Sequence, residues 1–330
     1  MVVIETRNVS KTAGENILLS ATSLEISAGS SIAIMGETGS GKSTLLKMMA
    51  GLLEPSSGAV YLRGKKLENP AEQLIPGHPA IAYLSQHFEL RNNYKVIDVL
   101  AMAARLPEAD CLQIIDLCRI SHLLQRKTHE VSGGERLRIA LARLLVAQPD
   151  VLLLDEPFTN LDNVNKSIIR EVLQEIRSAG DLTCIMVSHH PEDVLPWAEK
   201  LIIMQKGSII QAGTPEKVYY EPVSGYAASL TGIHNPVFPG EENMAHSIGI
   251  AGNLPYWIRP EQLIINGPEK GGVGGVITES IFFGHCWHVL VNIGYRNLTV
   301  LTTANKWIVG TKVSLSVRHQ NEENGTQAGA

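Results

Sequence analysis

The glycine-rich segment Gly36–Thr44 fits the pattern G-x-x-x-x-G-K-[ST] of loops that bind phosphate. The apolar run Ser31–Met35 precedes it and an amphipathic helical pattern follows, as such loops require. Glycines let backbone N–H groups turn toward phosphate oxygens, and the helix adds the positive end of its dipole. Lys42 is expected to reach the β- and γ-phosphates, and the Ser43 hydroxyl to ligate Mg²⁺. The nucleotide-binding residues predicted here are Gly36, Glu37, Thr38, Gly39, Ser40, Gly41, Lys42, Ser43 and Thr44.

Two acidic residues, Asp155 and Glu156, follow the apolar run Val151–Leu154. A carboxylate at the end of a buried strand beside a phosphate loop is placed to hold Mg²⁺, directly or through a water. The adjacent Glu156 is placed to polarise the water that attacks the γ-phosphate. Two acids after a strand also serve simply to cap the next segment, but their pairing with the loop favours a hydrolytic site.

Ser132 and Glu135 match the S-x-x-E pattern of a capping box, and an apolar helical pattern follows them. By itself this pattern predicts only a well-capped helix. Gly133 and Gly134 fall in the first turn, where each costs about 1 kcal/mol relative to alanine. They are accounted for if the backbone approaches a ligand closely, in which case the helix N-terminus offers a second anion site.

Apolar patterns outline the elements that must position these residues. The expected strands are 2–5, 17–26, 31–35, 151–154 and 184–187. Helical periodicity runs through 95–130 and again through 168–176. Alternating strands and helices of this kind predict an α/β nucleotide-binding fold.

The pattern changes between about 235 and 270, where five prolines are expected to break any helix. The run Gly271–Gly275 opens a new section, and apolar residues then alternate with a period of two over 287–293 and 313–317. This alternation is typical of a small antiparallel β unit. The polar tail 321–330 is expected to be frayed.

His285, Cys286 and His288 invite comparison with a metal site. On alternating strand positions, Cys286 and His288 would share one face while His285 would point away. No further pair of ligands has the spacing of a zinc site, so a packed or exposed strand is favoured.

Composition limits the class of protein. The chain has 330 residues, of which 44% are hydrophobic and 18% charged, and a net charge of −5. This length suggests two globular domains, and the acidic balance disfavours a protein that coats nucleic acid. The four cysteines form no C-x-x-C pair and are expected to be reduced in a cytosolic protein. No apolar run approaches ~18 residues, so we expect neither a membrane span nor an export signal.

Over residues 1–235 the sequence resembles the ATP-binding-cassette (ABC) ATPases, on six segments in the family's order and spacing. These are Gly36–Thr44, Gln86 after Tyr83–Ser85, Ser132–Glu135, Asp155–Pro157, Asn160–Asp162 and Val187–His189. The resemblance implies a P-loop cassette with a RecA-like core and a helical subdomain at about 87–135. It also implies that two copies face head to tail and enclose two ATP molecules.

The same resemblance implies roles for single residues. The signature expected to face the nucleotide of the other copy comprises Ser132, Gly133, Gly134 and Glu135, the first three at the phosphate. Gln86 would approach Mg²⁺ and the attacking water, Asp162 would bridge the two copies, and His189 would contact the γ-phosphate. His190 is interpreted as a bystander.

Two features depart from the family pattern. The position where relatives stack adenine on an aromatic residue holds Ala13, which predicts modest discrimination between bases. The helical stretch between Gln86 and Ser132 is shorter than in similar importers. That stretch receives the membrane subunit in the family, so its length bears on the partner rather than on hydrolysis.

Residues 236–320 resemble, more loosely, the C-terminal β-barrel (OB-like, TOBE-like) of importer ATPases, with matches at Trp257–Glu261 and Gly284. This implies an ATPase subunit for uptake of a small solute. Its expected partners are a second copy, permease membrane subunits and, indirectly, a solute-binding protein, with no nucleic acid. It would lie peripherally on the cytoplasmic face of the membrane. Two alternatives remain: a soluble ABC-type switch acting on ribosomes or nucleic acid, and the motor of an exporter.

Overall fold

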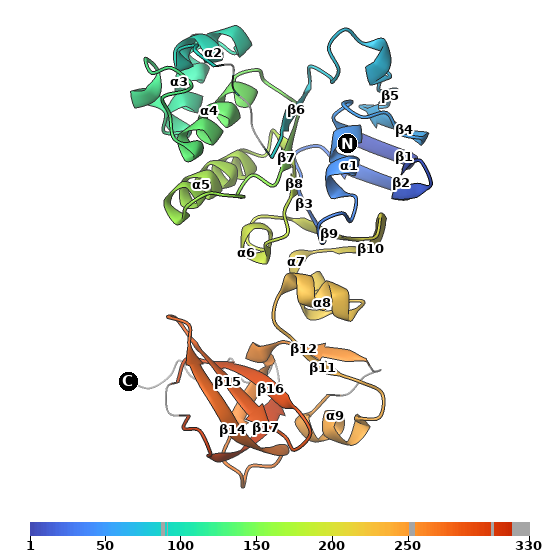
Figure 1. The fold of residues 1–330 in the computed structure, drawn as a ribbon, viewed down its shortest axis with the longest axis vertical. Coiled ribbons are helices and arrows are strands. Elements are labelled where there is room, and N and C mark those ends of the chain that lie inside the picture. Colours follow the sequence, from blue (N-terminus) through green and yellow to red (C-terminus); the bar gives the residue numbers. More distant parts are fainter. Residues whose placement is uncertain (87–89, 91, 251–254, 305–306, 319–330) are drawn as a thin grey trace. The chain divides into compact units, whose positions relative to one another are not determined.

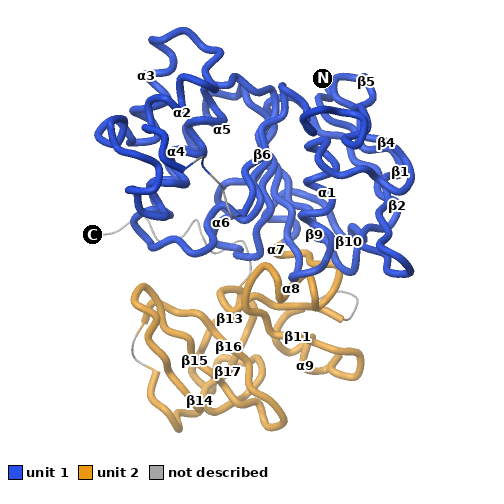
Figure 2. The backbone as a smooth tube through the Cα atoms, turned by 45° about the horizontal axis from the view of Figure 1, so that its top comes forward, with its two compact units in different colours: residues 1–218 blue, residues 219–330 orange. Residues whose placement is uncertain are grey.

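The computed structural model describes residues 1–86, 90, 92–250, 255–304 and 307–318. The tail expected at 321–330 lies outside the described residues. The chain divides into two compact units, Met1–Val218 and Tyr219–Ala330, coloured separately in Figure 2. Each unit is described by itself.

A six-stranded sheet forms the centre of unit 1 (Figure 1). Its order is β10 (Ser208–Gly213), β9 (Lys200–Gln205), β3 (Ser31–Met35), β8 (Thr183–Val187), β7 (Val151–Asp155) and β6 (Ile81–Leu84). All neighbours from β9 to β6 are parallel, and only β10 is antiparallel. β3, β7 and β8 are buried along their whole length, which explains their continuous apolar sequences. The carboxyl ends of β3, β8, β7 and β6 therefore meet at one edge of the sheet.

A second, antiparallel sheet contributes to the same core. Its order is β2 (Asn16–Ser27), β1 (Val2–Ala13), β4 (Ser57–Leu62) and β5 (Lys65–Lys66). Apolar side chains of both sheets pack around helix α1 (Lys42–Met49), whose Leu45, Leu46 and Met49 are fully buried. β1 is longer than the expected strand at 2–5. Several register shifts interrupt its pairing with β2 and obscure the alternation of its side chains, so the sequence pattern showed only its beginning.

Helices complete unit 1. They are α2 (Val96–Ala103), α3 (Glu108–Leu117), α4 (Gly133–Leu145), α5 (Asn163–Ala179) and α6 (Pro191–Val194), with 3₁₀ turns η1 (Pro70–Glu72) and η2 (Ser121–Leu123). The last two residues of α7 (Pro215–Tyr220) belong to unit 2. The predicted capping box is confirmed: Ser132 Oγ accepts from the Glu135 N–H at 3.3 Å, and Glu135 Oε2 accepts from the Ser132 N–H at 2.8 Å. Within the described ranges, no helix has the length and apolar character needed to cross a lipid bilayer.

Unit 2 is mostly antiparallel β structure, as predicted. A five-stranded sheet has the order β13 (Leu263–Asn266), β17 (Lys312–Val317), β14 (Val273–Phe282), β15 (Trp287–Asn292) and β16 (Asn297–Thr302). A two-stranded sheet pairs β11 (Asn235–Val237) with β12 (Tyr256–Ile258), and the remaining elements are α8 (Gly225–Thr231), α9 (Glu242–Ile248) and η3 (Pro260–Gln262).

Two predictions for this region were wrong. α9 forms between Pro239 and Pro255, since a seven-residue helix fits between prolines that only prevent longer ones. His285 and Cys286 lie in the turn before β15 and not on alternating strand positions, because β14 ends at Phe282. Cys286 is buried there, at 2% exposure.

Among the residues that the structure describes, Arg259 is the largest fully buried side chain, at 0% exposure. Its guanidinium group lies 2.6–3.2 Å from five oxygen atoms, those of Thr231 Oγ1 and of the backbone carbonyls of Tyr219, Ala228, Gly232 and Ile233. It also stacks on the Tyr219 ring, 3.9 Å from the centroid. Burial lowers the pKa of Arg259. These bonds hold residues 219–233 to Arg259 within unit 2.

Candidate active site

The phosphate loop connects β3 to α1. Lys42 Nζ donates to the carbonyl oxygens of Gly36 at 2.7 Å and of Glu37 at 2.8 Å, and lies 3.4 Å from Ser40 Oγ. A cavity of about 160 Å³ lies at the loop. It is lined by Leu18, Gly39, Gly41, Lys42, Ser43 and Thr44. The predicted loop therefore surrounds a space next to its lysine.

The backbone at Gly41 explains one of the glycines in the motif. Its φ of +96° lies in the left-handed region, and a Cβ at this position would stand 2.7 Å from the carbonyl oxygen of Leu18. Any larger residue would push the loop away from β2. Leu18 also lines the cavity but was not among the predicted site residues. The feature that could have indicated it is an exposed apolar side chain on a strand.

Burial lowers the pKa of Lys42, while the nearby carboxylates of Glu156, Asp155 and Glu37 act in the opposite direction. The ammonium group is thus a desolvated cation that donates hydrogen bonds to oxygen atoms of the loop itself. Phosphate oxygens carry full negative charge and are stronger acceptors for such a group. The loop is suited to bind an anion at this point.

Asp155 ends β7 and is 4% exposed. Ser43 Oγ donates to its Oδ1 at 2.8 Å, and the Tyr83 hydroxyl donates to its Oδ2 at 2.8 Å. Burial, followed by the bond to Asp155, raises the pKa of Tyr83, so its hydroxyl stays protonated. This contact of Tyr83 was not predicted from the sequence. The feature that could have indicated it is a side-chain hydroxyl within an apolar strand, two residues before the loop that holds Gln86.

The donors at this position fit Mg²⁺. A serine hydroxyl and one carboxylate are hard oxygen ligands, and Mg²⁺ in nucleotide sites takes few protein ligands, keeps waters and adds phosphate oxygens. Ser43 and Asp155 are the residues that would hold it. Gln86 lies exposed directly after β6.

Glu156 and His189 follow β7 and β8, and their side chains meet. His189 Nδ1 lies 2.9 Å from both carboxylate oxygens of Glu156. Glu156 has a φ of +53°, unusual for a residue with a side chain, and such strain is concentrated at functional sites. The His189 side chain is 43% exposed and that of Glu156 is 12% exposed. The predicted bystander His190 packs its ring 4.0 Å from that of His189.

The signature residues and Asp162 lie elsewhere in unit 1. Ser132 and Gly133 are exposed at the start of α4, and Gly134 is buried. Asp162 caps α5 by accepting from the Asn165 N–H at 2.8 Å. Neither the signature nor Asp162 lines the phosphate-loop cavity in the described part of the chain.

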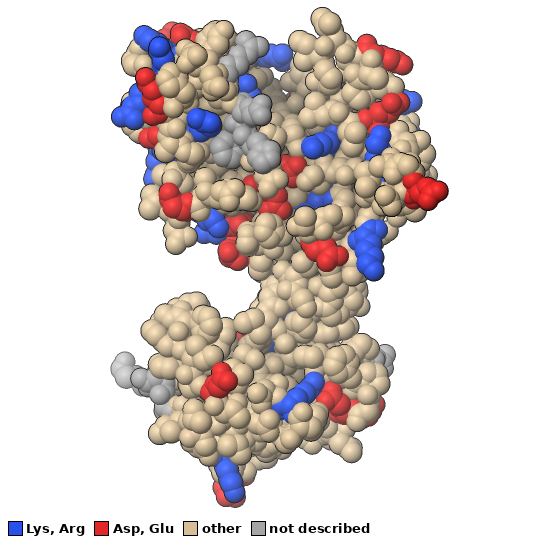
Figure 3. Space-filling model, viewed as in Figure 1, with Lys and Arg blue, Asp and Glu red and all other residues tan. Residues whose placement is uncertain are grey.

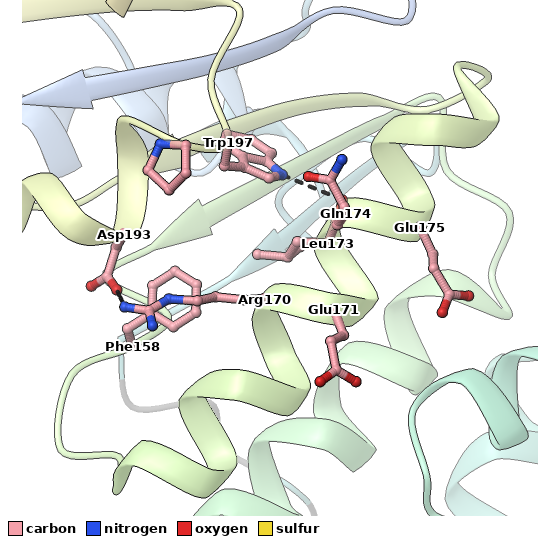
Figure 4. A pocket seen from close by; sticks show the side chains of 9 residues that line it. Phe158, Arg170, Glu171, Leu173, Gln174, Glu175, Asp193 and Trp197 are labelled. Atoms are coloured by element: carbon pink, nitrogen blue, oxygen red, sulfur yellow. Dashed lines mark hydrogen bonds and ion pairs between the residues drawn. The ribbon is translucent and has the colours of Figure 1, made fainter. Parts of the chain in front are cut away.

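A larger cavity, about 450 Å³, opens beside α5 and α6 (Figure 4). Arg170 of α5 donates to Asp193 of α6 at 2.5 Å, and the Asp193 side chain is fully buried. Trp197 Nε1 donates to the carbonyl oxygen of Leu173 at 3.3 Å. The first bond ties α6 to α5, and the second ties the segment after α6 to α5. α6 begins two residues after His189, so these bonds help to hold the segment that carries His189.

A phosphate loop after β3, paired carboxylates after β7 and a histidine after β8 stand at one edge of a parallel sheet. This arrangement defines a P-loop nucleoside-triphosphatase. The family model for ABC transporters matches residues 19–159. The chain is 32% identical to the sulfate/thiosulfate import ATP-binding protein CysA 2 of Rhizobium meliloti, over 89% of this chain and 85% of the relative. It therefore belongs to the ABC transporter ATPases, as its sequence motifs predicted.

Other comparisons agree. The spermidine/putrescine import ATP-binding protein PotA of Mycoplasma mycoides subsp. mycoides is 29% identical over 97% of this chain and 96% of its own. Among solved structures, cbiO1 from Clostridium perfringens, part of the ABC transporter complex cbiONQ, has a TM-score of 0.59 and 28% identity. The match covers 67% of this chain and 91% of cbiO1. The ATP-binding cassette MJ1267, at 24% identity and a TM-score of 0.57, shares the fold.

Proposed function

We propose that this protein is the ATP-hydrolysing subunit of an ABC importer and that it works as a head-to-tail pair. The observation that carries the importer assignment is the length of the similarity to import ATP-binding proteins. Those relatives match 89–97% of the chain and so include unit 2 as well as the cassette. This extent favours an importer over the exporter motor and over the soluble switch.

The assembled residues support a division of labour within one copy. The backbone of Gly36–Thr44 and the ammonium group of Lys42 bind the phosphates of ATP. Ser43 and Asp155 would hold Mg²⁺, with Gln86 near it, and the ion when bound would supply neutralisation of the charge on the phosphates. Glu156 orients the attacking water and accepts its proton, while His189 is positioned by Glu156 to contact the γ-phosphate.

The second copy supplies the rest of the pocket. Ser132 and Gly133 are exposed at the N-terminus of a thirteen-residue helix, where backbone N–H groups and the dipole favour an anion. Gly134 and Glu135 complete this signature, Glu135 through the capping box that fixes the turn. Asp162 bridges the copies. The N-terminus of α4 is suited to phosphate, but it does not line the phosphate-loop cavity of its own chain. This supports binding to the nucleotide of the other copy.

The solute is not set by the cassette. The two curated relatives above are named for cationic polyamines and for anionic sulfate and thiosulfate. We therefore assign selectivity for a small solute to permease and solute-binding partners. The protein would lie peripherally on the cytoplasmic face of the membrane, bound to the permease. On the face seen in Figure 3, Lys and Arg are interspersed with Asp and Glu over unit 1, which disfavours nucleic acid as a partner.

The head-to-tail pair is tested with two differently tagged copies, one carrying Lys42→Met and the other Ser132→Arg. Mixed pairs isolated through both tags contain one pocket with both defects and one intact pocket. We expect their ATP turnover to be at least roughly tenfold above that of either parent. Purified mixed pairs as inactive as the parents would reject binding in trans. Recovery of the wild-type protein with ribosomes and not with permease-containing membranes would favour the soluble switch.

Ala13 stays the residue proposed at the adenine. It is exposed at the end of β1, and the apolar Ile17 and Leu18 follow on β2. Without a stacking ring we predict similar turnover of ATP and GTP. Ala13→Tyr should tighten ATP binding by about 1–3 kcal/mol, and Ala13→Leu, which adds apolar area without a ring, by less. A tenfold or greater preference for ATP in the turnover of the wild type would contradict this prediction, and nucleotide affinities measure the effect of the two variants.

A further inference from the structure

The two glycines of the signature have different surroundings. Gly133 is exposed, and a Cβ built on it meets no atom within 4 Å. Gly134 is buried, and its Cβ would stand 2.2–2.4 Å from the Cγ, Oδ1 and Nδ2 atoms of Asn165. Contacts this short do not occur in folded proteins. Only the absence of a side chain at Gly134 lets Asn165 occupy its position.

Backbone conformation does not explain the glycine. Gly133 and Gly134 both lie in α4 and neither has a positive φ, so the backbone at both positions accepts alanine. Alanine is also the better helix former. The requirement at Gly134 is therefore steric and comes from α5.

Asn165 is held in place by Asp162. Its backbone N–H donates to Asp162 Oδ1 at 2.8 Å, and its side-chain Nδ2 donates to Asp162 Oδ2 at 2.9 Å. One residue thus occupies both oxygens of this carboxylate. The same two bonds lower the pKa of Asp162. Displacing the Asn165 amide would break the second bond and leave Oδ2 without this donor, while the backbone bond to Oδ1 remains.

We propose that Asn165 is a positioning residue that couples the signature turn to Asp162 within a single copy of the chain. Gly134 makes room for the Asn165 amide, and the amide orients the Asp162 carboxylate. The signature helix and the loop that ends at Asp162 then move as one piece. The functional consequence rests on the proposed bridging role of Asp162, whereas the coupling itself does not.

Thermal unfolding of the full chain tests the coupling. Gly134→Ala forces the Asn165 side chain to turn away and lose its bond to Asp162, and should lower the unfolding midpoint by about 2–4 °C, while the matched control Gly133→Ala should leave it unchanged or raise it. In a double-mutant cycle, Gly134→Ala combined with Asn165→Ala should unfold close to Asn165→Ala alone, since the collision is gone. Equal effects of the two glycine variants, or additive effects in the cycle, would overturn the proposal.

Should Gly134→Ala fail to fold, recovery of folded protein on adding Asn165→Ala is the expected result. Failure of the double variant to fold would equally overturn the coupling.

A second readout tests positioning. Asn165→Asp keeps the shape of the side chain but replaces the donor Nδ2 with an oxygen. With hydrolysis blocked by Glu156→Gln, it should weaken ATP-induced dimerisation at least fivefold, in the same direction as Asp162→Asn. Loss with Asp162→Asn but not with Asn165→Asp would overturn the positioning role of Asn165. If neither variant changes dimerisation while the Gly134→Ala and Asn165→Ala cycle is non-additive, the coupling stands and the proposed bridging role of Asp162 is rejected.

Discussion

Glu156→Gln is expected to reduce ATP turnover by about a thousandfold while ATP still binds, because the amide keeps the size of the carboxylate but cannot accept a proton. Its side chain can still contact His189, so the geometry of the pair, 2.9 Å in the wild type, is largely retained. Phosphate release should show the reduced hydrolysis, and nucleotide binding should show retained affinity. Size-exclusion chromatography with ATP should show a stabilised dimer.

The control is Glu192→Gln, which neutralises an exposed acid of α6 close in sequence to His189. It should hydrolyse ATP at the wild-type rate. Turnover near that rate in the Glu156 variant would show that another group activates the water.

Arg259→Met is expected to destabilise unit 2 by about 4 kcal/mol or more. Methionine fills part of the volume, but five buried oxygen atoms lose their donor, and each unsatisfied buried group costs about 1–3 kcal/mol. Denaturant unfolding of the full chain should show an early transition that is absent from the wild type. Proteolysis should first cleave near residues 219–235.

Arg259→Lys keeps the positive charge but not the planar geometry of the guanidinium group, so it shows which of the two stabilises unit 2. A single ammonium group has three donors and no planar fork, so it reaches only some of these oxygens and should recover a minor part of the lost stability. Wild-type unfolding in Arg259→Met would mean that other contacts hold residues 219–233 to the rest of unit 2.

The edge of the sheet that carries the candidate site was predictable because its signals are local in sequence. The buried strands, the phosphate loop and the capping box of Ser132 each depend on residues that are close along the chain. β1 was underestimated because its register shifts are visible only against its partner strands. α9 was missed because proline excludes a helix only at and around its own position.

Tyr83 and Asn165 were missed for a different reason. The Tyr83 hydroxyl acquires its role only when β6 pairs with β7, and the parallel pairing of these two strands spans about 70 residues of chain. Asn165 matters because Gly134, on another helix, has no side chain. Neither residue departs from what a strand or a helix tolerates, so no local pattern distinguishes them.

The hydroxyl of Tyr83 has a mechanical consequence. Tyr83 is the next-to-last residue of β6, the strand that leads into Gln86, and it donates to the Asp155 carboxylate that also accepts from Ser43. A membrane partner that pulls on the segment beyond Gln86 would strain this bond before it displaced the strand. Part of the force would thus reach Asp155 through the Tyr83 hydroxyl. Tyr83→Phe removes this hydroxyl and should couple movement of the segment less tightly to Ser43 and Asp155.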